Sequence, residues 1–306
     1  MINNPKKLTL SLILGILITI SAIGQQPPLQ DTTPLSSIHD AMEWMDNNTN
    51  TLTQSKFWPK VNPALFLENL RRNVQKPVLI YAGRSTDFCG YGALTYVMVR
   101  DNPLGYLKCL VDLYKLGSAK YGNIQFTPSS AIKLAAGTLQ FTGRLDIRPA
   151  DQLWFLCLAD HFKGYINIFD PHYRPGDENK LWAGVNYNKF NRMMRKLLNY
   201  KVNAKGSDLI RPWWVGDLYT YLNENINKGT MLLFLNNTYL HRKTHSNIKP
   251  RVPTHYVVLE RISKDEEDLI TIVYWDYGAR SLRKVTPEFL SKIVYGISIC
   301  TKKTGK

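Results

Sequence analysis

The chain contains a cysteine in the setting of a thiol nucleophile. Cys89 follows a turn-like stretch at residues 82–87 and precedes a helical pattern at residues 90–100, whose apolar residues repeat on one face. The pattern places the thiol in the first turn of an amphipathic helix. The unpaired amide groups and the dipole of that turn favour negative charge. The thiolate is the reactive form of cysteine, so Cys89 is the candidate nucleophile.

His255 and Asp276 are the candidate base and the candidate orienting carboxylate. His255 opens the apolar strand pattern H-Y-V-V-L-E-R-I, and Asp276 ends the next pattern, I-V-Y-W-D. The polar loop 264–268 joins the two as a hairpin, and strands of ordinary length then bring both side chains level. A carboxylate there fixes the imidazole tautomer. Each residue also has a purely structural interpretation: Cys89 as an ordinary buried cysteine, His255 as a structural histidine of a strand, and Asp276 as a turn-forming aspartate.

Residues beside the thiol suggest how its helix begins and how a substrate approaches. Ser85, Thr86 and Asp87 are all side-chain types that cap helix N-termini. Gly90 and Gly92 lack side chains, and we expect them to leave room for a substrate backbone beside the sulfur.

The predicted elements change from helices to strands along the chain. Helical patterns cover residues 37–45, 63–74, 90–100, 103–117, 128–136, 149–163, 187–198 and 215–227. Strand patterns cover residues 77–81, 230–235, 254–262, 269–275, 280–285 and 295–300, with a short helix from Thr286. Helices followed by an antiparallel sheet predict an α+β fold.

Four motifs occur in order: D-F-C-G-Y-G-A-L from Asp87, H-Y-V-V-L from His255, W-D-Y-G from Trp275 and V-T-P-E-F-L from Val285. In these the chain resembles the papain-like cysteine peptidases of the bacteriocin-leader-processing (double-glycine) type, over residues 80–100 and 253–297. The resemblance implies a papain-like domain at residues 61–306, with the nucleophile helix packed on a C-terminal antiparallel sheet. It also implies that Cys89, His255 and Asp276 form the triad. Residues 101–229 would be a large helical insertion.

Three departures from the family pattern concern the site itself. Phe88 is inserted before the cysteine, and Tyr277 stands where the family has proline. The family's glutamine, which donates to the oxyanion, is missing upstream of Cys89. The replacement candidates are Gln75, Arg84 and Ser85, and the sequence does not choose among them. Loss of one such donor typically costs about 10²–10³ in rate.

The N-terminus has the pattern of an export signal. Lys6 and Lys7 precede an apolar run from Leu8 to Ile23, and Ala22 and Gly24 provide small residues at the spacing that signal cleavage needs. We predict a signal peptide at residues 1–24 and a linker or N-terminal extension at residues 25–60. The protein would be periplasmic or secreted. An uncleaved N-terminal anchor is the alternative, although the run is short against the ~20 residues that span a bilayer.

The net charge of the chain indicates which classes of partner it can bind. The formal net charge is +15, which serves solubility or attracts an anionic substrate or surface. No nucleic-acid motif accompanies it, so we expect a peptide, protein or cell-wall peptide substrate and no nucleic acid.

Cys109, Cys157 and Cys300 lie in apolar stretches and are expected to be buried residues that only fill space in the core. A disulfide between Cys109 and Cys157 is the alternative.

No metal or cofactor is predicted. His241 and His245 have a helical ligand spacing, but their H-R-K-T-H segment is basic and lacks a carboxylate. The leading hypothesis is therefore an exported cysteine peptidase or amide hydrolase that acts through an acyl-thioester. A transamidase or cell-wall amidase on the same fold is the first alternative. A catalytically degenerate binding protein is the second.

Overall fold

The computed structural model divides the chain into two compact units, residues 1–31 and residues 32–306. The residues described below all belong to the second unit. They are 34–83, 86–138, 147–162, 174–176, 178, 183–236, 240, 253 and 255–303. The predicted export signal at residues 1–24 lies outside them. Among the described residues, no helix combines the length and the apolar character needed to span a membrane.

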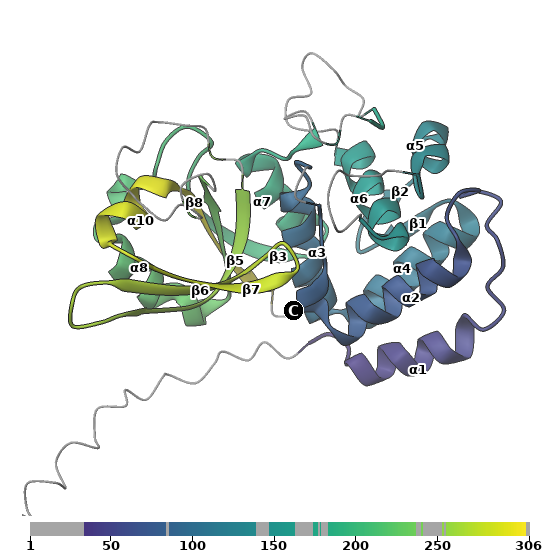
Figure 1. Cartoon of the computed structure of the whole chain (residues 1–306), viewed down its shortest axis with the longest axis horizontal. Helices are drawn as coiled ribbons and strands as arrows, with labels where there is room; N and C mark the ends of the chain where they lie inside the picture. The colour runs from purple at the N-terminus through teal and green to yellow at the C-terminus, as the bar shows by residue number, and fades with distance from the viewer. Residues whose placement is uncertain are drawn as a thin grey trace, which may run out of the picture. The chain divides into compact units, whose positions relative to one another are not determined.

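The second unit combines helices with an antiparallel sheet, as the predicted α+β class requires (Figure 1). The six-stranded sheet has the order β3-β8-β4-β5-β6-β7, and every neighbouring pair is antiparallel. Its strands are β3 (Tyr200–Gly206), β4 (Thr230–Leu235), β5 (His255–Lys264), β6 (Ile270–Asp276), β7 (Ala279–Val285) and β8 (Val294–Lys302). A second sheet pairs β1 (Ala119–Tyr121) with β2 (Ile124–Phe126).

Helices cover the sheet and extend away from it on one side (Figure 1). They are α1 (Ile38–Asn48), α2 (Pro63–Gln75), α3 (Cys89–Asp101), α4 (Pro103–Leu116), α5 (Ser130–Ala135), α6 (Pro149–Phe162), α7 (Tyr187–Lys196), α8 (Leu218–Asn225) and α10 (Pro287–Ile293). Many of these helices begin close to the residues at which the sequence patterns predict helix starts. Asn62 and Asn102 cap α2 and α4 ahead of a proline, and Gly117 ends α4 in the left-handed conformation.

Strand alternation gives the sheet two different buried faces. Leu232, Phe234, Tyr256 and Val258 point into the core shared with the helices. Residues of the opposite parity, such as Leu233 and Val257, point into a second core closed by residues of α8 and α10. Helix α3 therefore lies between the helical layer and the sheet, with its residues 89–99 all buried.

The segment predicted as a linker to residue 60 belongs in its second half to the compact body. Trp58 is fully buried, and its indole donates to the Leu113 carbonyl at 2.6 Å. The hydroxyl of Ser55 donates to the Tyr114 carbonyl. Ala41 and Met45 bury one side of α1. Burial of this size anchors the segment to α4, so only its first part lies outside the described body.

Two secondary-structure predictions were wrong. Pro77–Leu79 is a 3₁₀ helix, not a strand, because the amides of Leu79 and Ile80 donate to the carbonyls three residues earlier, those of Lys76 and Pro77. The insertion at 101–229 is also not purely helical. It contains the β1–β2 hairpin, and β3 adds an edge strand to the main sheet beside β8. Lysines in β3 are typical of a protected sheet edge.

Candidate active site

The structure brings Cys89, His255 and Asp276 together from three elements. Cys89 is the first residue of α3, His255 is the first residue of β5, and Asp276 is the last residue of β6. All three side chains are buried: 7% of Cys89 is exposed, 2% of His255 and 3% of Asp276. Cys89 is the most exposed of the three, and a reagent meets it on this small exposed part.

Strand register accounts for the contact between the histidine and the carboxylate. Val258 pairs with Trp275, which puts Asp276 beside Val257. Residues 255 and 257 share one face of β5, so His255 and Asp276 are diagonal neighbours on that face. The His255 Nε2 atom lies 2.6 Å from Asp276 Oδ1.

The second ring nitrogen of His255 is left for the thiol. A hydrogen bond with Cys89 contributes to the titration of His255, together with the bond to Asp276. Burial alone would lower the pKa of His255. The hydrogen bonds and negative charges of Asp276 and Cys89 outweigh burial and raise that pKa to about 9. The imidazolium is therefore the favoured form near neutral pH.

Tyr277, which replaces the family's proline, contacts the imidazole. Its ring is stacked on His255, with 4.5 Å between the ring centroids and 23° between the planes. Tyr277 has φ 43° and Gly278 has φ 80°, so both central residues of the β6–β7 turn are left-handed. This is the pattern of a type I′ hairpin turn. The positive φ of a bulky residue is uncommon and strained.

Helix α3 begins one residue earlier than its pattern indicated, and its cap differs from the expectation. The N-cap residue is Phe88, which offers no side-chain hydrogen bond. Thr86 instead orders the preceding turn: its hydroxyl donates to the Ala82 carbonyl and accepts from the Phe88 amide. Asp87 is half-buried, and burial raises its pKa.

Gly90 and Gly92 face the protein interior rather than a substrate. A Cβ at Gly90 would lie 2.4 Å from Val185 Cγ1 and 3.2 Å from the Tyr256 ring. A Cβ at Gly92 would lie 3.0 Å from the Ala82 Cβ. The two glycines therefore let α3 approach its neighbours closely, which corrects the prediction that they make room for substrate.

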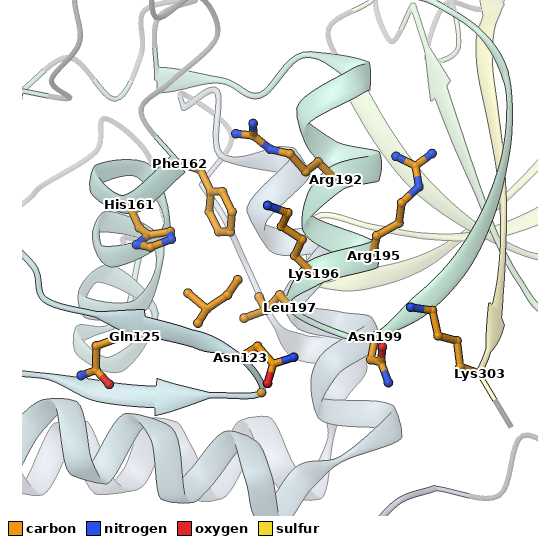
Figure 2. A pocket seen from close by; sticks show the side chains of 12 residues that line it. Asn123, Gln125, His161, Phe162, Arg192, Arg195, Lys196, Leu197, Asn199 and Lys303 are labelled. Atoms are coloured by element: carbon orange, nitrogen blue, oxygen red, sulfur yellow. The ribbon is translucent and has the colours of Figure 1, made fainter. Parts of the chain in front are cut away.

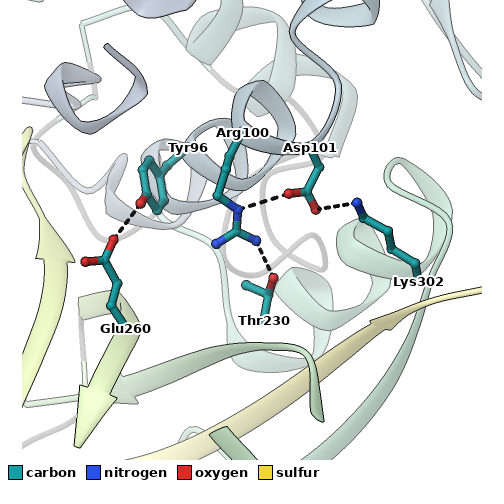
Figure 3. A network of polar contacts seen from close by, with 6 residues as sticks. All are labelled: Tyr96, Arg100, Asp101, Thr230, Glu260 and Lys302. Carbon is teal, nitrogen blue, oxygen red and sulfur yellow. Dashed lines mark hydrogen bonds and ion pairs between the residues drawn. The ribbon is translucent and has the colours of Figure 1, made fainter. Parts of the chain in front are cut away.

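A polar network holds the far end of α3 on the sheet (Figure 3). Tyr96 donates to Glu260 of β5 at 2.6 Å, and its ring is stacked on Trp275 at 4.8 Å. Arg100 bonds to Thr230 of β4 and to Asp101. These contacts fix the second half of α3 relative to the sheet whose strands carry the partners of Cys89.

The candidate oxyanion donors are only partly placed. Gln75 is the last residue of α2 and is exposed, in contrast to the three buried residues of the triad. Arg84 and Ser85 lie outside the described residues, as do His241 and His245. Within the described ranges, no cluster of three His, Cys, Asp or Glu side chains could hold a metal ion.

The other three cysteines are chemically distinct from Cys89. All four cysteines are free and buried, which excludes the alternative of a Cys109–Cys157 bridge. Burial raises the pKa of Cys109 and of Cys157 far above its ordinary value, and that of Cys300 to about 12. These thiols are inert near neutral pH.

Sequence reasoning missed the stacked tyrosine. The signal was present: D-Y-G between two strand patterns is typical of a two-residue hairpin turn, and such a turn projects its first residue next to the strand end. No protein-family model matches the chain, and comparison with curated proteins found no match. The assignment of the site therefore depends on its geometry.

Proposed function

We propose that this protein is a thiol-dependent amide hydrolase of the papain-like kind, with Cys89 as nucleophile, His255 as general base and acid, and Asp276 as the residue that orients His255. The observation that carries the proposal is the arrangement around one imidazole. Its Nε2 atom is 2.6 Å from a buried carboxylate, and its other side meets a thiol at the start of a helix.

The geometry supports a two-step reaction. Cys89 Sγ, as the thiolate, attacks the carbonyl carbon of an amide, and the C–N bond breaks as His255 gives its proton to the leaving amine. This leaves a thioester on Cys89 and a neutral imidazole. His255 then takes a proton from water, whose oxygen attacks the thioester carbon. The C–S bond breaks, which releases the carboxylic acid and restores the thiolate–imidazolium pair of Cys89 and His255.

Asp276 and Tyr277 support the histidine in both steps. The carboxylate stabilises the imidazolium that gives up its proton in the first step and forms again in the second, and it holds the Nε2 side of the ring. The stacked ring of Tyr277 restricts rotation of the imidazole plane. We also propose that the reaction takes place outside the cytoplasm, on a peptide, a protein or the peptide part of a cell wall.

Substrate digestion by matched cysteine variants tests the proposal. We would incubate the full-length protein, Cys89→Ala and Cys300→Ala separately with an unfolded protein and with purified peptidoglycan. Mass spectrometry then identifies the cleavage products that carry a newly formed amine. We expect Cys89→Ala to abolish cleavage and Cys300→Ala to retain it. Cleavage of the protein alone assigns a peptidase, and cleavage of the wall alone assigns an amidase. Undiminished cleavage by Cys89→Ala would contradict the proposal.

A further inference from the structure

A basic pocket is lined by residues from the segment between the two motif-bearing parts of the chain and by Lys303, which follows β8 (Figure 2). It has a volume of about 760 Å³. Helix α7 bounds one side, the end of α6 bounds the other, and the β1–β2 hairpin lies below in the view. Its polar side chains include Arg192, Arg195, Lys196, Lys303, Asn123 and Gln125. Cys89, His255 and Asp276 are not among the described residues that line it.

The pocket is rich in donors and poor in acceptors. Two guanidinium groups and two ammonium groups line it, and none of its described lining residues is a carboxylate. Within the part of the chain that the structure describes, no ion pair joins these four cations to an acidic side chain. Arginine and lysine have only donors, so the oxygen atoms of an anion are their natural partners.

Helix α7 concentrates this charge on one side. Arg192 lies three residues before Arg195 and four before Lys196, and like charges at these spacings destabilise a helix. Lys189, one turn earlier on the same helix but not part of the pocket lining, adds a further cation, and burial together with Arg192 lowers its pKa to about 8. The helix dipole compensates cations only in the last turn. It does not compensate Arg192, nor Lys303, which follows β8.

We infer that this pocket binds a soluble anion that carries several phosphate groups. A single phosphate is small against the volume, whereas a chain of phosphates can meet all four cations at once. Arginine suits this chemistry because its planar fork donates to two oxygens of one phosphate. Phe162 and Leu197 are buried at the pocket wall and give it an apolar base. The inference is independent of the proposed hydrolase activity.

Binding of tripolyphosphate to matched charge variants tests the inference. The pocket variant is Arg192→Gln/Arg195→Gln/Lys196→Gln. The control, Lys60→Gln/Lys76→Gln/Arg211→Gln, removes the same charge at exposed positions elsewhere. Calorimetry at fixed ionic strength measures Kd for full-length protein and both variants. We expect the pocket variant to weaken binding by at least about tenfold, since charged hydrogen bonds are lost, and the control to bind as the unaltered protein does.

Four further measurements complete the test. Lys303→Gln should also weaken binding, and this single change keeps the test valid if the triple variant fails to fold. Citrate, a carboxylate polyanion, should bind more weakly than tripolyphosphate. Vesicles of phosphatidylglycerol should float the pocket variant and the unaltered protein equally, because the ligand is soluble. Equal tripolyphosphate affinity in all variants, or tighter citrate binding, would overturn the inference, and so would pocket-dependent flotation. Cys89→Ala should bind tripolyphosphate normally, which separates this site from the catalytic one.

Discussion

The ring of Tyr277 is stacked on the imidazole of His255, with 4.5 Å between their centroids, although the backbone of Tyr277 is left-handed at φ 43°. A bulky residue in this conformation costs about 1–3 kcal/mol. The strain places an aromatic ring against the one side chain that touches both Cys89 and Asp276. We interpret the turn as a device that orients the histidine.

Replacement of Tyr277 separates the turn from the ring. Asparagine tolerates the left-handed conformation and lacks the ring, so Tyr277→Asn should keep the hairpin turn and lose the stacking. We expect the alkylation rate of Cys89 to fall about two- to tenfold, the value of one aromatic contact. Tyr277→Phe, which keeps the ring, should react as the unaltered protein does. Equal rates in all three proteins would show that the tyrosine does not position His255.

Asp276→Asn should weaken the charged form of His255. Without the carboxylate, the imidazolium loses its nearest negative charge, and the pKa of His255 should fall from about 9 toward or below its ordinary 6.5. Proton NMR of the imidazole across pH measures this directly, with His255→Gln used to assign the signal. An unchanged titration in Asp276→Asn would mean that the 2.6 Å contact does not control the histidine.

The same interaction gives stability a defined pH dependence. The pKa of His255 is raised in the folded protein, so its contribution is complete below about pH 6.5 and is lost as pH rises through about 9. The free energy of unfolding should therefore decline between about pH 6 and about pH 9. Urea unfolding of the unaltered protein and of His255→Gln measures this, and the decline should be smaller in the variant. Parallel curves would contradict the assignment.

A buried acid in the helical layer should act in a different pH range. Asp151 accepts from Asn69 at 3.1 Å and from Asn73 at 2.6 Å. Burial nevertheless raises its pKa to about 6 from 3.8. Stability should fall as pH rises from about 4 to about 6, because the folded protein holds the proton more tightly. Asp151→Asn should remove this fall but cost about 1–3 kcal/mol, since its amide meets a donor. Calorimetric unfolding at several pH values checks both effects.

Gly90 tests how closely the nucleophile helix must pack. Alanine in a helix is ordinarily more stable than glycine by about 1 kcal/mol. At Gly90 the added Cβ would lie 2.4 Å from Val185, so Gly90→Ala should instead destabilise by about 1–3 kcal/mol. Gly92→Ala, with its nearest contact at 3.0 Å, is the milder control. Chemical unfolding compares the two, and a more stable Gly90→Ala would refute the packing argument.

Local patterns predicted the parts of the site that depend on neighbouring sequence. Helix and strand periodicity placed Cys89 in the first turn of a helix, and it predicted the hairpin loop at residues 264–268 and the contact between His255 and Asp276. The sequence patterns did not predict the features that depend on contacts between residues far apart in the chain. The role of Gly90 is set by Val185 and Tyr256, and β3 becomes a strand because β8 offers it an edge. The burial of Cys89 likewise depends on residues far along the chain.

The basic pocket is another feature that sequence patterns could predict only in part. The closely spaced Arg192, Arg195 and Lys196 are visible in the sequence. Their convergence with Lys303 and with the β1–β2 hairpin depends on tertiary packing, which periodicity does not report.

Iodoacetamide labelling of Cys89 is the most direct test of the central claim, that this thiol and His255 form a working pair. Rates are measured by mass spectrometry from about pH 5 to about pH 9 in unaltered protein and in His255→Ala. Cys109, Cys157 and Cys300 are internal controls, because burial raises the pKa of each of these thiols and so keeps the reactive thiolate scarce. We predict fast labelling of Cys89 that persists below neutral pH and is lost in His255→Ala. Slow labelling, or a rate unchanged in His255→Ala, would contradict the pair and leave a binding protein on this fold.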